Sequence, residues 1–409
     1  MRLSPRWHLV AGVTTLGLLV AACGAPDTGE TSQNSEGSAT SEVPDKPSEP
    51  VTLNVFDVAG NLQLTQGMIE EFAEENPDVI AEVNFEQGPA PDLVGKITAQ
   101  QDAGKVDIGL VLTGTDGLSA GVEEDIWVPI VSEFGDRLSN MDTYIEPAAE
   151  MQTLAQDQGV VVTYYPSGPL LEYNPEKVPN PPTTAEELLA WAKENPGRFG
   201  YARPANSGPG RTFLMGLPYI LGDKDPMDPI NGWEKTWAYL SELNQYADYY
   251  PTGTTPTMKN LADGTWDMIA STTGWDINPR ALGTVPNTVE VQKLDGFTWV
   301  TDAHYAVIPD GVDADTQSAV LLLIQDMLTP EQNAKAFDSG YFYPGPAVEG
   351  ATLDLAPQES QDTIEEFGRD EYADWIEDNP KALPLDAENL VAAFDKWDRE
   401  IGQGKTQEG

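Results

Sequence analysis

Apolar and polar residues alternate along residues 51–55 and again along residues 79–85, as they do in β-strands with one buried face. Between them, residues 64–72 place apolar side chains at helical spacing, and Asn76-Pro77 predicts the end of that helix. Residues 106–112 lean apolar throughout, which is typical of a buried parallel strand. The pattern predicts a strand–helix–strand unit, because parallel strands need a helical crossover between them.

The rest of the chain continues in the same manner. β-branched and aromatic residues predict a strand over residues 160–165, and further strands are predicted over residues 266–270 and 304–308. Capping boxes and helical spacing predict helices after Thr184, over residues 233–246, after Thr329, and over residues 363–401. Alternating strands and helices of this kind predict the α/β fold class.

The N-terminus has the features of an export signal. Arg2 and Arg6 precede an apolar run over residues 9–22, which is too short for a comfortable bilayer span. The run ends in Leu-Val-Ala-Ala followed by Cys23, which closely resembles a lipobox and implies cleavage before Cys23 and lipid attachment to it. The alternative is an ordinary signal peptide followed by an incidental cysteine. We therefore expect a lipoprotein signal peptide over residues 1–22 and a disordered, acylated linker over residues 23–50, which is rich in Gly, Ser, Thr, Pro, Asp and Glu.

Composition limits the chemistry of the exported chain. Without the two arginines of the signal, 20 basic and 67 acidic residues remain, a net charge of −47, which argues against nucleic acid and anionic lipid surfaces as partners. The acidity is either a solvated surface suited to high salt or an electrostatic funnel for a cationic solute. With one cysteine and His304 as the one histidine after the signal, we expect no thiolate metal site, no histidine-based triad and no cofactor.

Several short segments, in their order, carry a family resemblance. They are residues 54–56 with 60–61, 104–108 with 113–116, 182–189, 195–204 leading into 210–213, 305–309 and 328–334. Together they resemble the extracellular solute-binding proteins of bacterial ABC importers, in particular the branch with iron-, thiamine- and polyamine-binding members.

The resemblance implies a two-lobed periplasmic-binding-protein-like fold of type II, with a ligand cleft between the lobes and a helical C-terminal region. It places residues 51–163 and 304–409 in lobe 1 and residues 164–303 in lobe 2. It further implies a monomer without enzymatic activity, held at the extracellular face of the cell membrane by its lipid, which delivers a small solute to ABC permease subunits. Two lobes also suit the length, because the 359 residues from Val51 onward exceed what one core usually organises.

Candidate ligand contacts follow from a general rule for α/β proteins. Ligands bind at the loops that leave the carboxyl ends of strands, in the crevice between lobes. This rule and the resemblance select Asp57, Gly60, Asn61, Thr113, Gly114, Asp116, Ser207, Arg211, Thr212, Trp275, Asp276 and Tyr305. For each of them the alternative is a structural role, as a turn, a helix cap or a core residue.

The same residues suggest the nature of the solute. Carboxylates and Trp275 suit a cation, whereas the helix start at residues 207–212, with Arg211 and Arg280, suits an anion. We therefore expect a thiamine-like, polyamine or otherwise charged or zwitterionic solute. The alternatives from other classes are a surface-anchored carbohydrate-active enzyme that uses paired carboxylates, and an adhesion or scaffold lipoprotein without a pocket.

The lipid anchor is testable. Cys23→Ser should give an exported protein that no longer partitions with membranes, because the acyl chains would be its only attachment. Membrane fractionation with a carbonate wash measures this, and a variant that stays with the membrane after the wash contradicts the lipobox interpretation.

Overall fold

The computed structural model describes residues 43–407. Cys23, the signal peptide and most of the predicted linker lie outside the described residues. The last eight residues of that linker, 43–50, differ from the prediction, because they lie against the folded body. Pro47 is buried, and the amide of Ser48 donates to Oδ1 of Asp315 at 3.0 Å. A polar composition predicted disorder here, but it does not reveal contacts with residues far along the chain.

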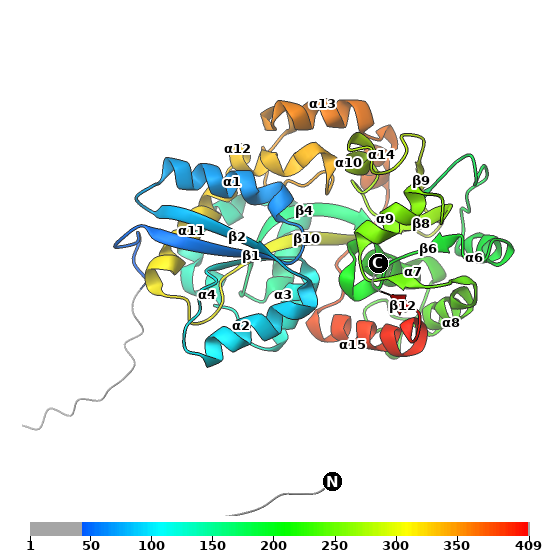
Figure 1. The fold of residues 1–409 in the computed structure, drawn as a ribbon, viewed down its shortest axis with the longest axis horizontal. Helices are drawn as coiled ribbons and strands as arrows, with labels where there is room; N and C mark the ends of the chain where they lie inside the picture. Colours follow the sequence, from blue (N-terminus) through cyan, green and yellow to red (C-terminus); the bar gives the residue numbers. More distant parts are fainter. Residues whose placement is uncertain (1–42, 408–409) are drawn as a thin grey trace, which may run out of the picture. The chain divides into compact units, whose positions relative to one another are not determined.

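The first lobe is built on a mixed six-stranded sheet. β1 pairs in parallel with β2 and β3, while β10 runs antiparallel to β3 and to β4. Figure 1 shows α1 on one side of this sheet and α2 and α3 on the other. The strands are β1 (Val51–Asp57), β2 (Ile80–Gln87), β3 (Leu110–Thr113), β4 (Val160–Gly168), β10 (Trp299–Val307) and β11 (Lys381–Ala382). The helices are α1 (Leu62–Glu75), α2 (Leu93–Asp102), α3 (Thr115–Glu123), α4 (Ile130–Phe134), α5 (Glu146–Gln152), α11 (Ala314–Met327) and α12 (Pro330–Asn333).

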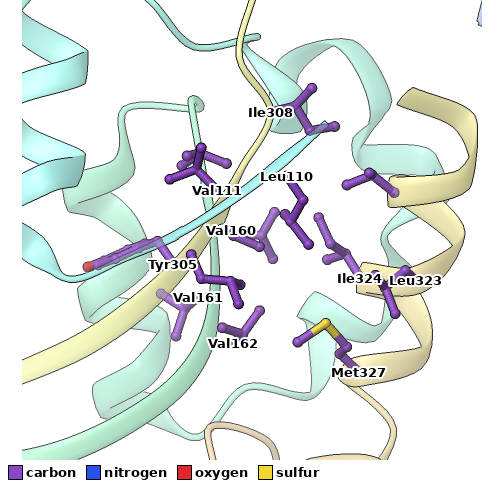
Figure 2. Close-up of a cluster of buried hydrophobic side chains, with 14 of the residues drawn as sticks. Leu110, Val111, Val160, Val161, Val162, Tyr305, Ile308, Leu323, Ile324 and Met327 are labelled. Atoms are coloured by element: carbon purple, nitrogen blue, oxygen red, sulfur yellow. The ribbon is translucent and has the colours of Figure 1, made fainter. Parts of the chain in front are cut away.

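The strand–helix–strand unit is present as predicted. α1 buries Leu64, Met68, Ile69 and Phe72, and it ends at Asn76, whose amide donates to the carbonyl of Phe72 at 2.9 Å. The core of the first lobe forms where α11 meets β3 and β4. Figure 2 shows side chains from these three elements gathered together: Leu110, Val160, Leu323, Ile324 and Met327.

The second lobe has its own sheet and core. β5 lies between β8 and β9 and is antiparallel to both, and β6 pairs in parallel with β8. The strands are β5 (Leu170–Tyr173), β6 (Phe199–Gly200), β8 (Met268–Ser271) and β9 (Glu290–Gln292). The helices are α6 (Ala185–Glu194), α7 (Gly208–Leu221), α8 (Glu234–Leu243), α9 (Thr254–Ala262) and α10 (Ile277–Ala281). Thr184 caps α6 by accepting from the amide of Glu187 at 3.1 Å, as its capping box predicted.

β4 and β10 connect the two lobes. Figure 1 shows them side by side, and their register pairs Asp302 with Tyr165 and Val300 with Gly168. Residues 303–307 of β10 belong to the core of the first lobe, whereas Val300 belongs to that of the second. The lobes therefore meet on two adjacent strands.

The C-terminal region differs in part from its predicted assignment to lobe 1. It is divided into α13 (Gln358–Phe367), α14 (Asp370–Asp378), α15 (Ala387–Trp397) and the short β12 (Thr406–Gln407), which pairs with β7 (Tyr250–Pro251) of the second lobe. Its apolar side chains enter the core of the second lobe through Leu385, Leu390, Ala393, Trp397 and Ile401. Helical spacing predicted an apolar face on these residues, but spacing alone does not determine which core receives that face.

A strained turn precedes two aromatic residues of the first lobe. Asp338 (φ 22°) and Ser339 (φ 51°) both lie at positive φ at the end of η7 (Ala334–Gly340), just before Tyr341 and Phe342. Burial raises the pKa of the Asp338 carboxyl to about 6, and the charge of Glu359 acts in the same direction. The folded protein therefore binds this proton more tightly than the unfolded chain does.

Asp338→Asn should change the pH dependence of stability. The pKa of Asp338 in the folded protein, about 6, exceeds its ordinary value of 3.8, so its stabilising contribution is complete below that value and is lost as pH rises through 6. The amide stays neutral and tolerates positive φ, so the variant should be about 1–3 kcal/mol more stable at pH 7, with a much smaller difference at pH 4. Urea unfolding between pH 4 and 8 measures this. The exposed Asp354→Asn is the control, and identical profiles for wild type and Asp338→Asn contradict the argument.

Candidate functional site

A cavity of about 230 Å³ lies between the two lobes, next to the crossing strands. The loops after β1 and β3 and the turn at residues 341–342 line it from the first lobe. The starts of α7 and α9 and the loop after β8 line it from the second. The lining residues are Val58, Ala59, Gly60, Gly114, Asp116, Tyr165, Asn206, Ser207, Gly208, Arg211, Thr254, Thr255, Trp275, His304, Tyr341 and Phe342.

The loop after β1 presents its backbone to the cavity. The Asp57 carboxylate is buried and accepts from the amides of Ala59, Asn61 and Leu62 at 3.0 to 3.1 Å. Oδ1 of Asn61 accepts from the hydroxyl of Thr65 at 2.6 Å. Of the three residues predicted here, Gly60 lines the cavity, while Asp57 and Asn61 hold the turn and the start of α1 and do not line it.

The loop after β3 brings one carboxylate to the cavity. Thr113 is buried and donates to the carbonyl of Gly114 at 3.2 Å, so it does not line the cavity, whereas Gly114 and Asp116 do. Oδ1 of Asp116 accepts from the amide of Gly117 at 3.0 Å and lies 3.3 Å from Nη1 of Arg211. The Asp116 side chain keeps 17% of its surface exposed, so a solute in the cavity can reach it.

The start of α7 offers little to an anion, contrary to the expectation of an anion cradle. Oγ of Ser207 accepts from the amide of Gly210 at 3.3 Å, and the carbonyl of Ser207 accepts from the amide of Arg211 at 2.8 Å. Pro209 has no amide hydrogen. Thr212 donates to the carbonyl of Gly208 at 3.1 Å and does not line the cavity. Two of the first-turn amides already serve the cap, so Ser207 acts mainly as an N-cap residue.

Arg211 is held in a buried ion pair with Asp302, a residue that sequence reasoning missed. The Asp302 carboxylate accepts from Arg211, from the hydroxyl of Tyr165 at 2.8 Å and from that of Thr115 at 2.9 Å. Burial raises the pKa of Asp302, but the charges and hydrogen bonds around it, the charge of Arg211 first among them, together hold the pKa below its ordinary value. Burial lowers the pKa of Arg211, and the charges of Asp302 and Asp116 more than reverse this. Both groups are therefore ionised, and Arg211 faces two carboxylates.

Aromatic rings also line the cavity. The rings of Trp275 and Tyr341 have centroids 5.1 Å apart, and Phe342 lies 4.7 Å from Tyr165 and 4.8 Å from His304. Nδ1 of His304 lies 3.0 Å from the hydroxyl of Thr163, and burial lowers the pKa of the imidazole, so the ring is neutral at pH 7. Nε of Arg211 and Nε1 of Trp275 are buried and have no hydrogen-bond partner among residues 43–407. Neither atom is exposed to the cavity, so both are unsatisfied donors inside the folded protein.

Comparison with known proteins identifies this architecture. Residues 67–366 match the family of bacterial extracellular solute-binding proteins. The chain belongs to this family. Its members are the solute-binding components of ABC transporters. No curated protein matches the chain in sequence.

Solved structures of similar proteins share the two-lobed fold of this solute-binding protein. A putative spermidine/putrescine ABC transporter protein from Listeria monocytogenes is 14% identical, with a TM-score of 0.59, over 86% of this chain and 99% of its own. The periplasmic binding protein AfuA from Actinobacillus pleuropneumoniae, with fructose-6-phosphate bound, is 14% identical, with a TM-score of 0.60 and the same coverage. AgtB from A. tumefaciens R10, in complex with agropinic acid, is 16% identical, with a TM-score of 0.58 and the same coverage. At this identity the similarity shows the fold and not the solute.

Neither a membrane-spanning helix nor a cluster of metal ligands occurs in the described part of this solute-binding protein. None of its helices is long and apolar enough to cross a membrane. No group of three or more His, Cys, Asp or Glu side chains within residues 43–407 is arranged to hold a metal ion.

Two predicted site residues lie away from the cavity. Tyr305 is buried in the first lobe and donates to the carbonyl of Met151 at 2.9 Å. Asp276 is fully buried and accepts from Nε of Arg369 at 2.6 Å, from the hydroxyl of Tyr372 at 2.5 Å and from Arg280 at 3.3 Å. Asp276 thus ties α10 to α14, and Arg280 points to this network rather than to a solute.

Other lining residues were missing from the prediction. Tyr165 and His304 lie within strands, where an apolar or aromatic residue is ordinarily a core residue. Thr254 and Thr255 open α9 after a two-residue strand that the hydrophobic pattern does not reveal. Tyr341 and Phe342 did have a signal, since with Tyr343 they form an aromatic run between Gly340 and Pro344-Gly345.

Asp276→Asn should destabilise the protein without changing any residue that lines the cavity. Arg280 and Arg369 are both buried and both pair with the Asp276 carboxylate, and the substitution removes that negative charge. The loss should lower the unfolding free energy by about 3 kcal/mol. Urea denaturation measures the loss, and the exposed Asp374→Asn on α14 is the control. A loss below about 1 kcal/mol would show that the network contributes little.

Proposed function

We propose that this solute-binding protein captures a small solute with a cationic group in the cavity between its lobes and presents it to the permease of an ABC importer. The observation that carries the proposal is the charge balance around Arg211. Asp302 and Asp116 provide two negative charges against the one positive charge of Arg211, and His304 is neutral. A bound cation would restore neutrality, whereas a bound anion would add to an existing excess.

The position of Asp116 supports a cation in the cavity. Its carboxylate is the partly exposed one, and the aromatic rings of Trp275 and Tyr341 line the same space. Aromatic faces attract ammonium groups, most strongly where water is excluded. A carboxylate together with aromatic faces is therefore suited to a solute amine or quaternary ammonium group.

The cavity also holds neutral polar groups. The side chains of Asn206, Thr254 and Thr255 line it, and each can donate a hydrogen bond. We infer that the solute also carries an acceptor oxygen, as a hydroxylated amine or an amino acid does. The cavity volume of about 230 Å³ suits a small molecule of this kind.

The similar structures bind different solutes on one fold. The Listeria protein is named for spermidine and putrescine, which are cations, whereas AfuA holds a sugar phosphate. The negative balance around Arg211 favours the first kind of solute for this chain.

We further propose that the protein is a monomer that performs no chemistry on its solute. Lipid on Cys23 would tether it to the extracellular face of the membrane, as the lipobox-like segment implies.

Calorimetric titration with a panel of probes tests the cationic solute. Putrescine, choline and glycine betaine represent cationic and zwitterionic solutes, and sulfate and fructose 6-phosphate represent anions. At least one cation or zwitterion should bind, and Asp116→Asn should weaken it by about 10- to 100-fold, or about 1.4 to 2.8 kcal/mol. Native mass spectrometry of protein purified without denaturation should find a carried solute of the same class.

A matched control is Asp107→Asn, which removes an exposed carboxylate paired with Lys105, away from the cavity. It should leave the affinity of every probe unchanged. Wild-type protein that binds sulfate or fructose 6-phosphate more tightly than every cation and zwitterion contradicts the proposal.

A further inference from the structure

Asp302 lies where four segments of the chain converge. It is 1% exposed and belongs to β10, one of the two strands that join the lobes. Its donors come from α7 of the second lobe, from α3 of the first lobe and from β4: they are Arg211, Thr115 and Tyr165. Its own strand adds the amide of Ala303 at 3.0 Å. A guanidinium, two hydroxyls and an amide thus converge on one carboxylate.

This set of donors is what an oxyanion ligand requires. Charge-assisted bonds from arginine, supported by hydroxyl and amide donors, are the usual way in which proteins hold a carboxylate, sulfate or phosphate. Arg211 and Tyr165 both line the cavity. The chain therefore places its own carboxylate against groups that would otherwise serve a bound anion.

We propose that Asp302 is a positioning residue that sets the sign of charge accepted by the cleft, because it occupies and neutralises an anion-binding site centred on Arg211. The inference rests on the proposed function, a cleft that accepts a cation. Beyond that function, Asp302 is the residue that excludes anions, and its removal should uncover an anion-binding site at Arg211.

The remaining contacts of Arg211 support this role. Without the Asp302 charge, Arg211 keeps one carboxylate, Asp116, at 3.3 Å, and that carboxylate is partly solvated. Nη2 of Arg211 would then lose the charged partner that it has in Asp302, and the hydroxyls of Ser207 and Thr254 lie on the same wall. The excess negative charge around Arg211 would fall to zero.

Sulfate and putrescine titrations of single variants test the inference. Wild type should bind sulfate at least 10-fold more weakly than Asp302→Asn does, and Asp302→Asn should bind putrescine at least 10-fold more weakly than wild type does. Asp116→Asn should shift both affinities in the same directions. Because Asp116 is partly exposed, this variant keeps the test decisive if Asp302→Asn does not fold.

A double variant separates charge selection from a merely structural role. Arg211→Met added to Asp302→Asn should abolish the gained sulfate binding, because Arg211 is the group that the first substitution uncovers. The control is Asp267→Asn, which breaks an Arg–Asp pair with Arg198 that does not line the cavity. It should gain no sulfate binding.

The possible outcomes distinguish the two proposals. Wild-type protein that prefers sulfate to every cation and zwitterion overturns the cationic solute and, with it, the masking role of Asp302. Wild type that prefers cations, together with Asp302→Asn and Asp116→Asn variants that fold and gain no sulfate binding, overturns the role of Asp302 alone. Sulfate binding that survives Arg211→Met in the double variant also overturns it.

Discussion

The buried ion pair between Arg211 and Asp302 is the interaction on which the cleft depends. An ionised group out of water needs a nearby counter-charge and saturated hydrogen bonds, and a buried charge that loses its partner is strongly destabilising. Asp302 satisfies this requirement with donors from α3, α7 and β4, so elements of both lobes are held to one strand at one point. This ion pair therefore fixes the positions of the elements that form the cavity wall.

The lobes and the cavity are organised around the same two strands. β10 contributes to both cores and pairs with β4, and the two strands carry His304 and Tyr165 into the cavity. Because these residues belong to strands and not to loops, their positions are set by the ladder of hydrogen bonds between the strands. The mobile part of such a site is then expected in the loops after β1, β3 and β8, which approach the strands from either lobe.

The second buried network shows how the carboxylates of this acidic chain divide their roles. Asp276 and Arg280 lie in a loop and helix next to the cavity wall, yet they turn toward Arg369 and Tyr372 of the C-terminal region. The C-terminal helices thus stabilise the second lobe, although the chain reaches them only after it has returned to the first. In contrast, Asp116 remains at the cavity surface, and its charge is available to a solute.

The sequence by itself determined the local structure and the architecture. Periodicities of 2 and 3.6 predicted β1, α1 and β2, a capping box predicted the start of α6, and the order of short segments indicated a two-lobed solute-binding fold. The loops at strand ends were also predicted, and Gly60, Gly114, Asp116, Ser207, Arg211 and Trp275 do line the cavity.

Only the tertiary structure decided which polar side chain in a loop faces the cavity. A carboxylate such as Asp57 satisfies itself equally well with the amides of its own turn, and Asp276 does so with arginines 4 and 93 residues away. Asp302 was missed for the same reason, since its partners are brought to it by the packing of the two lobes and not by their spacing along the chain.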